Sequence, residues 1–230
     1  MPMMRGLPSM RVLKPLLFAA CLGPFLLLVA NGFGIGGSLG ANPIDKITDV
    51  TGTWTLRFVL ITLAATPLRR LTGWNAIIRF RRMLGLFAFF YGSMHFLTWS
   101  VLDQGLALQF IGADIAKRPY ITVGFLGFSL MIPLAITSTA GWIRRLGGKR
   151  WQLLHRAIYL TAVCGVIHYL WLVKSDINRP LTYGAILAVL LGIRVWYAWR
   201  PKPAATAAST AAGAANAKAS ALRTAPRSSR

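Results

Sequence analysis

The sequence contains only three histidines, and their positions make them the first candidates for chemistry. His95, His155 and His168 each lie in or beside a strongly apolar stretch of the chain. Ionisable side chains inside membrane-spanning segments are energetically costly, and for that reason they usually serve a function. A single histidine of this kind can instead be a structural residue that hydrogen-bonds one helix to another.

His95 and His168 are expected to lie at the same depth in a membrane. In a helix that rises outward from Met83, His95 lies about 18 Å above the inner end. In a helix that rises from about His155, His168 lies about 20 Å above that level. Two imidazoles on different helices at one depth can bind a heme iron from opposite faces. Such a site has no open iron position, so it suits electron transfer and not oxygen chemistry.

His155 is not assigned by the same geometry. Thirteen residues turn a straight helix by about 220°, so His155 and His168 share a face only if the helix bends. The position facing His155 on the helix of His95 is Arg81, which is followed by Arg82. These arginines are expected to neutralise heme propionates or a flavin phosphate. We predict that His155 serves electron uptake at a quinol, flavin or second-heme site, with iron ligation and a structural hydrogen bond as the alternatives.

Six apolar runs are predicted to position these residues as transmembrane helices. A helix that crosses a bilayer needs about 20 mostly apolar residues, with a range of about 17–25. The runs are Pro15–Asn31, Thr53–Leu68, Met83–Leu102, Tyr120–Thr137, Leu153–Val173 and Leu181–Trp199. The second run is short and carries Arg57, which is expected to pair with a propionate or to extend toward the outer surface. The first run is interpreted as a membrane helix and not as a cleaved signal peptide, because no clear cleavage pattern follows it.

The distribution of charge gives the expected orientation. The chain has 230 residues, a net charge of +21 and 55% hydrophobic residues. With six helices, nineteen basic residues fall on one side and five on the other, and the second side also holds all five acids. The positive-inside rule then places both termini in the cytoplasm. This distribution excludes a soluble nucleic-acid binder, and the absence of glutamate disfavours catalysis by paired carboxylates.

The predicted fold is therefore all-α, an integral membrane bundle of six transmembrane helices. Residues 1–14 form a cytoplasmic N-terminus, residues 15–200 form the six-helix domain, and residues 201–230 form a cytoplasmic tail. This tail is rich in Ala, Ser, Thr and Lys and has no apolar pattern, which is typical of disorder.

Eight sequence stretches, in order, match a known family. They are Gly52-Thr-Trp54, T-L-A-A-T-P-L-R-R ending at Arg70, R-R-M-L-G-L from Arg81, Y-G-S-M-H from Tyr91, R-P-Y-I-T-V-G from Arg118, P-L-A-I-T-S from Pro133, R-R-L-G-G-K-R-W-Q-L-L-H-R from Arg144 and H-Y-L-W-L-V-K from His168. From about Pro15 to Arg200 the chain resembles the MsrQ family, the heme-binding membrane subunits of bacterial periplasmic methionine-sulfoxide reductase systems. This family lies within the ferric-reductase-like transmembrane superfamily.

The resemblance implies a b-type heme on His95 and His168, with His155 also a family histidine. It further implies an associated FMN, electrons taken from the respiratory quinone pool, and a location in the bacterial inner membrane. The electrons would pass to a periplasmic molybdopterin-containing subunit, which reduces oxidised methionine in proteins. The chain itself would then be an electron-transfer subunit, with the sulfoxide chemistry in its partner.

The lengths of the tail and of the outer loops agree with an electron-transfer role for this chain and sulfoxide reduction in a partner. About thirty residues follow the last predicted helix, too few for flavin- and nicotinamide-binding domains. Electrons are therefore expected from a membrane quinol or a separate flavin reductase. The outer loops, at most about twenty residues each, are too short to form a pocket for oxidised proteins. Two alternatives remain: a stand-alone ferric or quinone-linked reductase, and a heme-free transporter or membrane scaffold.

Overall fold

A computed structural model describes residues 10–199 of the chain, and every regular element in this range is helical. The elements are α1 (Met10–Gly32), α2 (Pro43–Thr72), a 3-10 segment η1 (Asn75–Phe80), α3 (Arg81–Leu97), a π-helical segment η2 (Thr98–Asp103), α4 (Leu108–Lys117), α5 (Pro119–Ile136), α6 (Ala140–Leu146), α7 (Gly148–His155), α8 (Ala157–Leu172) and α9 (Asn178–Trp199). The chain divides into two units between Leu191 and Gly192, and the described part of the second unit is the end of α9. The predicted tail 201–230 lies outside the described residues.

Five helical segments of the described chain are long and apolar enough to cross a membrane. They are α1, α5, α9 and the stretches Asn75–Asp103 and Gly148–Leu172. Each contains most of one predicted apolar run, so residues 10–199 are all-α as expected and supply five candidate spans for six predicted ones. The remaining run, Thr53–Leu68, lies inside α2, which does not meet the same criterion.

Helix α2 is much longer than the sequence predicted. It has 30 residues and begins ten residues before Thr53, and at 1.5 Å per residue it is about 45 Å long. Asn42 caps its start by accepting a hydrogen bond from the backbone N–H of Asp45, and Pro43 occupies its first turn. Gly73 ends it in the left-handed conformation and donates its N–H to the carbonyl of Arg69. These local signals lie outside the apolar run, so hydropathy alone did not find them.

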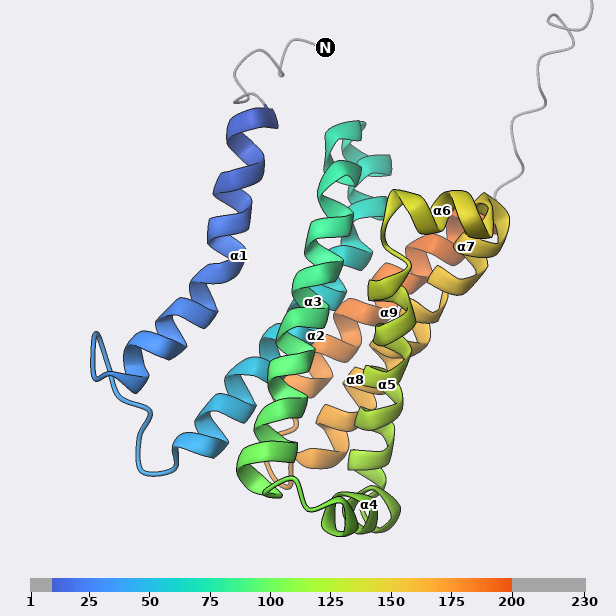
Figure 1. Ribbon diagram of the computed structural model, residues 1–230. Helices are drawn as coiled ribbons and strands as arrows, with labels where there is room; N and C mark the ends of the chain where they lie inside the picture. The colour runs from blue at the N-terminus through green and yellow to red at the C-terminus, as the bar shows by residue number, and fades with distance from the viewer. Residues whose placement is uncertain (1–9, 200–230) are drawn as a thin grey trace, which may run out of the picture. The chain divides into compact units, whose positions relative to one another are not determined.

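The low hydropathy of α2 is explained by its position within the first unit. Helix α2 packs along α3 and also contacts α8 (Figure 1). Val59 and Leu63 on this helix are almost completely buried, and the hydroxyl of buried Thr62 donates to the carbonyl of Phe58. A helix that faces protein can carry such threonines, because they satisfy their hydrogen bonds internally.

Helix α1 is joined to α3 by a side chain inserted into its backbone. The fully buried Tyr91 of α3 donates its hydroxyl to the carbonyl of Cys21 at 2.9 Å and accepts from the N–H of Phe25 at 3.0 Å. In an uninterrupted helix this N–H and this carbonyl would bond to each other. The tyrosine hydroxyl therefore bridges two backbone groups of α1, at the turn that contains Pro24.

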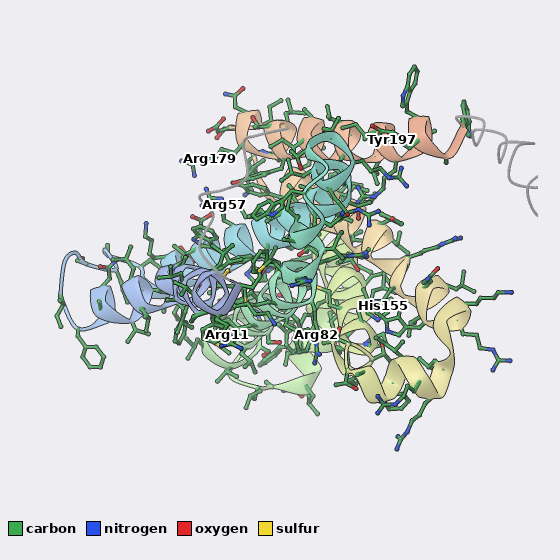
Figure 2. All side chains as sticks on the ribbon, turned by 90° about the horizontal axis from the view of Figure 1, so that it is seen from above. Arg11, Arg57, Arg82, His155, Arg179 and Tyr197 are labelled. Atoms are coloured by element: carbon green, nitrogen blue, oxygen red, sulfur yellow. The ribbon has the colours of Figure 1, made fainter. Side chains whose placement is uncertain are left out.

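The first unit has two chemically different ends. At one end α1 and α3 begin and α6 and α7 lie across the helices; at the other, α2 begins, and α5 begins beside α4 (Figure 1). All five acids of the chain lie near the second end, at Asp45, Asp49, Asp103, Asp114 and Asp176. We call this the acidic end and the opposite one the basic end, because Lys14, Arg79, Arg81 and Arg82 lie there. Figure 2 looks down on the unit from the basic end.

Candidate functional site

The structure brings the rings of His95 and His168 together. His95 lies near the end of α3 and His168 near the end of α8, each within about a turn of the acidic end of its helix. Their ring centroids are 6.0 Å apart and their planes are inclined by 83°. Both residues are half-buried. The equal depth expected from the sequence thus corresponds to a direct juxtaposition of two imidazoles.

One backbone carbonyl orients each of these rings. Nδ1 of His95 lies 3.0 Å from the carbonyl oxygen of Thr48 in α2, and Nδ1 of His168 lies 2.7 Å from that of Tyr120 in α5. A carbonyl oxygen can only accept, so the ring proton is on Nδ1 in both histidines. No group in the described part of the chain forms a hydrogen bond with Nε2 of either ring. Each imidazole therefore keeps its Nε2 lone pair available for a metal.

A glycine makes room for each ring. Gly52 follows Thr48 by four residues, and Gly124 follows Tyr120 by four. A Cβ atom at Gly52 would lie 2.9 Å from Nδ1 and Cε1 of His95, and one at Gly124 would lie 2.5 Å from Nδ1 of His168. Neither position tolerates a side chain beside the ring as it stands.

The two sites share one arrangement. In each, a glycine lies one helical turn after the residue whose carbonyl binds the histidine, and the missing side chain leaves that carbonyl accessible to a histidine from another helix. Sequence analysis did not identify these glycines as site residues, although both lie in stretches that carry the family resemblance. The repeated separation of four residues, from Thr48 to Gly52 and from Tyr120 to Gly124, is the only signal in the sequence. It acquires a meaning only once the histidines are placed against it.

The paired histidines fit a single iron held between them. With metal–nitrogen bonds of about 2.0–2.1 Å and ring centroids about 1.1 Å behind Nε2, two imidazoles opposed through Nε2 have centroids about 6.2–6.4 Å apart; the observed separation is 6.0 Å. Histidines that bind metals usually donate their other N–H to a carbonyl or carboxylate, as here. Residues 10–199 contain no group of three His, Cys, Asp or Glu side chains that could hold a metal ion by themselves.

His155 lies apart from this pair, where the helix breaks at Arg156 between α7 and α8. Its ring stacks on Trp151 with centroids 4.0 Å apart, and its Nε2 lies 3.0 Å from the hydroxyl oxygen of Thr137. That hydroxyl donates its own proton to the carbonyl of Pro133 at 2.6 Å, so it accepts from Nε2–H of His155. Nε2, which has no hydrogen-bond partner in His95 and His168, is therefore hydrogen-bonded to Thr137 in His155.

The two predicted arginines lie at the start of α3 and face different surroundings. Arg81 is half-buried and close enough to His155 for an electrostatic interaction. Arg82 is exposed and lines a groove beside α1. Both Arg82 and His155 are labelled in the view onto the basic end (Figure 2). The structure thus places Arg81, and not Arg82, against His155.

Arg57 is held by protein groups inside the first unit. Its Nε donates to the hydroxyl of Tyr183 in α9 at 2.9 Å, and its guanidinium lies 4.8 Å from the ring centroid of Trp54. The cation–π contact and the hydrogen bond fix the side chain between α2 and α9. This arrangement replaces the extension toward the outer surface that was one expectation from the sequence.

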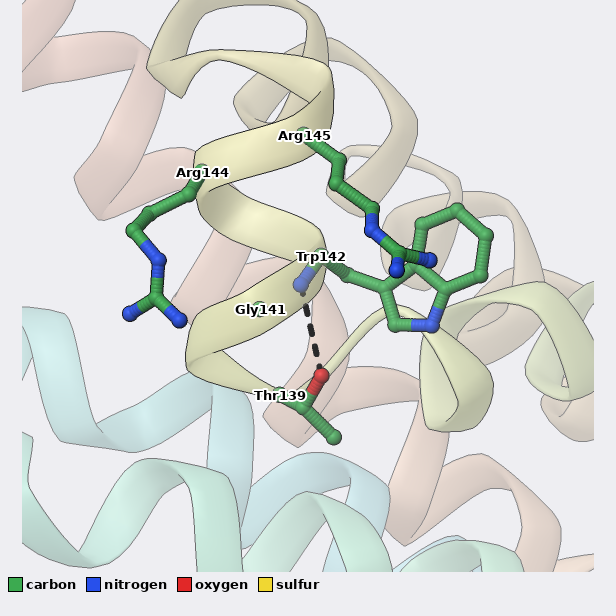
Figure 3. A pocket seen from close by; sticks show the side chains of 5 residues that line it. All are labelled: Thr139, Gly141, Trp142, Arg144 and Arg145. Atoms are coloured by element: carbon green, nitrogen blue, oxygen red, sulfur yellow. Dashed lines mark hydrogen bonds between the residues drawn. The ribbon is translucent and has the colours of Figure 1, made fainter.

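A separate shallow hollow of about 470 Å³ lies over α6 at the basic end (Figure 3). Thr139 caps this short helix by accepting from the N–H of Trp142, and the guanidinium of Arg145 lies over the indole ring of Trp142 at 5.5 Å. Tryptophan and arginine at such a position are typical of a segment at the membrane–water interface.

Comparison with known proteins identifies the family. Residues 51–166 match the family described as the ferric reductase like transmembrane component. Among curated proteins, a relative from Ralstonia nicotianae is 52% identical over 202 residues, which cover 87% of this chain and 92% of the relative. One from Herminiimonas arsenicoxydans is 52% identical over 197 residues, covering 85% and 89%. One from Xanthomonas euvesicatoria pv. vesicatoria is 55% identical over 188 residues, covering 80% and 85%.

Each of these relatives carries the name protein-methionine-sulfoxide reductase heme-binding subunit MsrQ. The similarity extends over most of both chains. The ferric-reductase-like segment, residues 51–166, contains His95, both glycines that make room for the histidine rings, Gly52 and Gly124, and the carbonyl partner Tyr120. Together with the five apolar helices, these similarities establish that the chain belongs to the MsrQ family of multi-pass, ferric-reductase-like membrane proteins.

Proposed function

We propose that this protein is a b-type cytochrome subunit of the bacterial inner membrane, which passes electrons from the quinone pool to a periplasmic methionine-sulfoxide reductase subunit. The observation that carries the proposal is the His95–His168 pair, with Nδ1 of each ring bonded to a carbonyl and Nε2 of each ring free. The relatives' name supports it, because it describes a heme-binding subunit of a reductase for protein methionine sulfoxide.

His95 and His168 would hold the iron of a b-type heme through Nε2. A heme held by these two histidines would supply one-electron transfer. The carbonyls of Thr48 and Tyr120 keep the proton on Nδ1 and fix the plane of each ring. In a transporter or scaffold the same two hydrogen bonds would serve only to join helices; the free Nε2 of each ring and the 6.0 Å separation of the rings support heme binding instead.

The six-helix topology belongs to the same proposal, with α2 as the sixth span. Its length of about 45 Å exceeds the hydrocarbon core of a bilayer, about 30 Å thick. Six spans place both termini on one side, and the excess of Lys and Arg at the basic end makes that side the cytoplasm. The acidic end, and the histidine pair near it, would then face the periplasm.

Electrons would leave toward a partner at the acidic end. Between η2 and α5 the chain holds only the ten-residue helix α4 and short flanking turns. A segment of this size favours reduction of oxidised proteins in a separate subunit, which we propose to be the molybdopterin-containing partner. The position of His95 and His168 in the last turns of their helices keeps the transfer distance to such a partner short.

Electrons would arrive at the basic end, where His155 lies. Because its Nε2–H donates to Thr137, its Nδ1 carries a lone pair that can take the proton released when a quinol is oxidised. Arg81 supplies positive charge beside this ring and suits the phosphate of an associated FMN, should a flavin reductase be the donor. We propose that His155 handles protons during electron uptake and does not ligate the iron of the His95–His168 pair.

A reduced-minus-oxidised spectrum of the purified protein tests the proposal. The wild type should show b-type absorbance, and His95→Ala and His168→Ala should each remove most of the bound heme. His155→Ala, the matched control, should keep the heme but slow its reduction by a quinol. Absence of b-type absorbance in the wild type, or full absorbance in both ligand variants, would contradict the proposed function. Complete heme loss in His155→Ala would contradict the proposed separation of roles.

A further inference from the structure

A groove of about 640 Å³ lies between α1 and the start of α3, and the proposed electron path does not use it. Three cations, Lys14, Arg79 and Arg82, line the groove at the basic end. We propose that this groove binds one anionic phospholipid, with its phosphate against the three cations and an acyl chain between the two helices. This inference concerns a lipid site and does not depend on the proposed electron transfer.

The groove changes from charged to apolar along its length. Both helices run from the basic end in the same direction (Figure 1), and each contributes a stripe of residues spaced by four. The stripes are Lys14, Phe18 and Leu22 on α1, and Arg82, Leu86 and Phe90 on α3. Eight residues of helix cover about 12 Å. A cationic head above about 12 Å of apolar wall matches a phospholipid whose phosphate lies at the interface.

The chain does not neutralise these cations. All five acids lie near the acidic end, and across residues 10–199 the single ion pair joins Arg118 to Asp114 at that end. Within the same range, Lys14, Arg79 and Arg82 have no hydrogen-bond or ion-pair partner. Basic pockets between transmembrane helices at the cytoplasmic side are typical binding sites for anionic lipid headgroups. The complementary charge must therefore come from outside the chain.

The lining favours a lipid over a quinone. The three cations could donate hydrogen bonds to a quinone carbonyl, but a neutral quinone head would leave their positive charge uncompensated, whereas a lipid phosphate compensates it. The side chains of Phe18 and Leu86 remain 51% and 36% exposed, so the wall is open for an acyl chain to enter sideways from the bilayer. His155, the residue proposed for electron uptake, does not line the groove.

The variant Lys14→Gln/Arg82→Gln tests the proposal, with Lys149→Gln/Arg150→Gln as the matched control. The control removes two exposed cations of α7 at the same end but outside the groove. Each protein is purified in detergent, titrated with phosphatidylglycerol or phosphatidylcholine, and examined by native mass spectrometry. The wild type and the control should retain one phosphatidylglycerol in preference to phosphatidylcholine. The groove variant should bind phosphatidylglycerol about twenty-five-fold more weakly, about fivefold for each of the two cations removed.

A second variant, Leu86→Trp, fills the apolar wall and keeps every cation, so it should also lower phosphatidylglycerol retention. The thermal midpoint and the monodispersity of each protein show that it is folded. Equal retention by the groove variant and the wild type would overturn the proposal. Equal retention of the two phospholipids by the wild type would also overturn it. A third contradicting result would be a neutral quinone that displaces phosphatidylglycerol and binds equally tightly to the groove variant and to the wild type.

Discussion

Replacement of Gly124 by alanine should loosen the proposed heme site without unfolding the protein. The new Cβ would lie 2.5 Å from Nδ1 of His168, so the ring must retreat by about 0.9 Å to reach an ordinary contact of 3.4 Å. A retreat along the hydrogen bond to the carbonyl of Tyr120 would lengthen that bond from 2.7 Å to about 3.6 Å, at which distance it no longer counts as a hydrogen bond. Loss of such an outer partner typically costs about 10–100-fold in metal affinity.

Gly52→Ala should have a smaller effect of the same kind. Its Cβ would lie 2.9 Å from two atoms of the His95 ring, which requires a retreat of about 0.5 Å. The 3.0 Å bond to Thr48 then lengthens to about 3.5 Å and weakens without being lost. The two variants should therefore rank in heme affinity as wild type, Gly52→Ala and Gly124→Ala, in descending order.

Gly85→Ala on α3 is the matched control. A Cβ there would meet only a methyl group of Thr62, at an ordinary 3.7 Å, and alanine favours a helix over glycine by about 1 kcal/mol. Heme titration of each purified protein, with the absorption spectrum and the thermal midpoint, separates loss of affinity from loss of fold. Wild-type heme affinity and an unchanged spectrum in Gly124→Ala would refute the argument that this glycine makes room for the ligand ring.

Two further predictions concern the attachment of α1 and the topology. Tyr91→Phe should lower the thermal midpoint and cost about 1–3 kcal/mol of folding stability, because the carbonyl of Cys21 and the N–H of Phe25 lose their buried partner. The control is Tyr120→Phe, because the hydroxyl of Tyr120 contacts only exposed Arg118. Equal thermal midpoints for the two variants would contradict this prediction. A reporter fused after Arg200 should be cytoplasmic and one inserted near Asp114 periplasmic, whereas a periplasmic C-terminus would exclude α2 as the sixth span.

Helix α2 illustrates where hydropathy fails as a guide. The clearest apolar runs lie in the five helical segments that are long and apolar enough to cross a membrane. Helix α2 packs against α3 and α8, so its sequence could retain Arg57 and several threonines. The boundaries of this helix depend on Asn42, Pro43 and Gly73, which are capping signals and not apolar residues.

The sequence by itself determined the all-helical class, five of the spans, the separation of acidic from basic residues, and the three histidines as candidate site residues. These properties depend on composition and on helical periodicity, which act over a few neighbouring residues. The tertiary structure alone decided that His95 and His168 meet at 6.0 Å, that Gly52 and Gly124 admit their rings, and that Nε2 of His155 is occupied by Thr137. Each of these contacts joins different helices, so it depends on how the helices pack and rotate against one another, which no local pattern specifies.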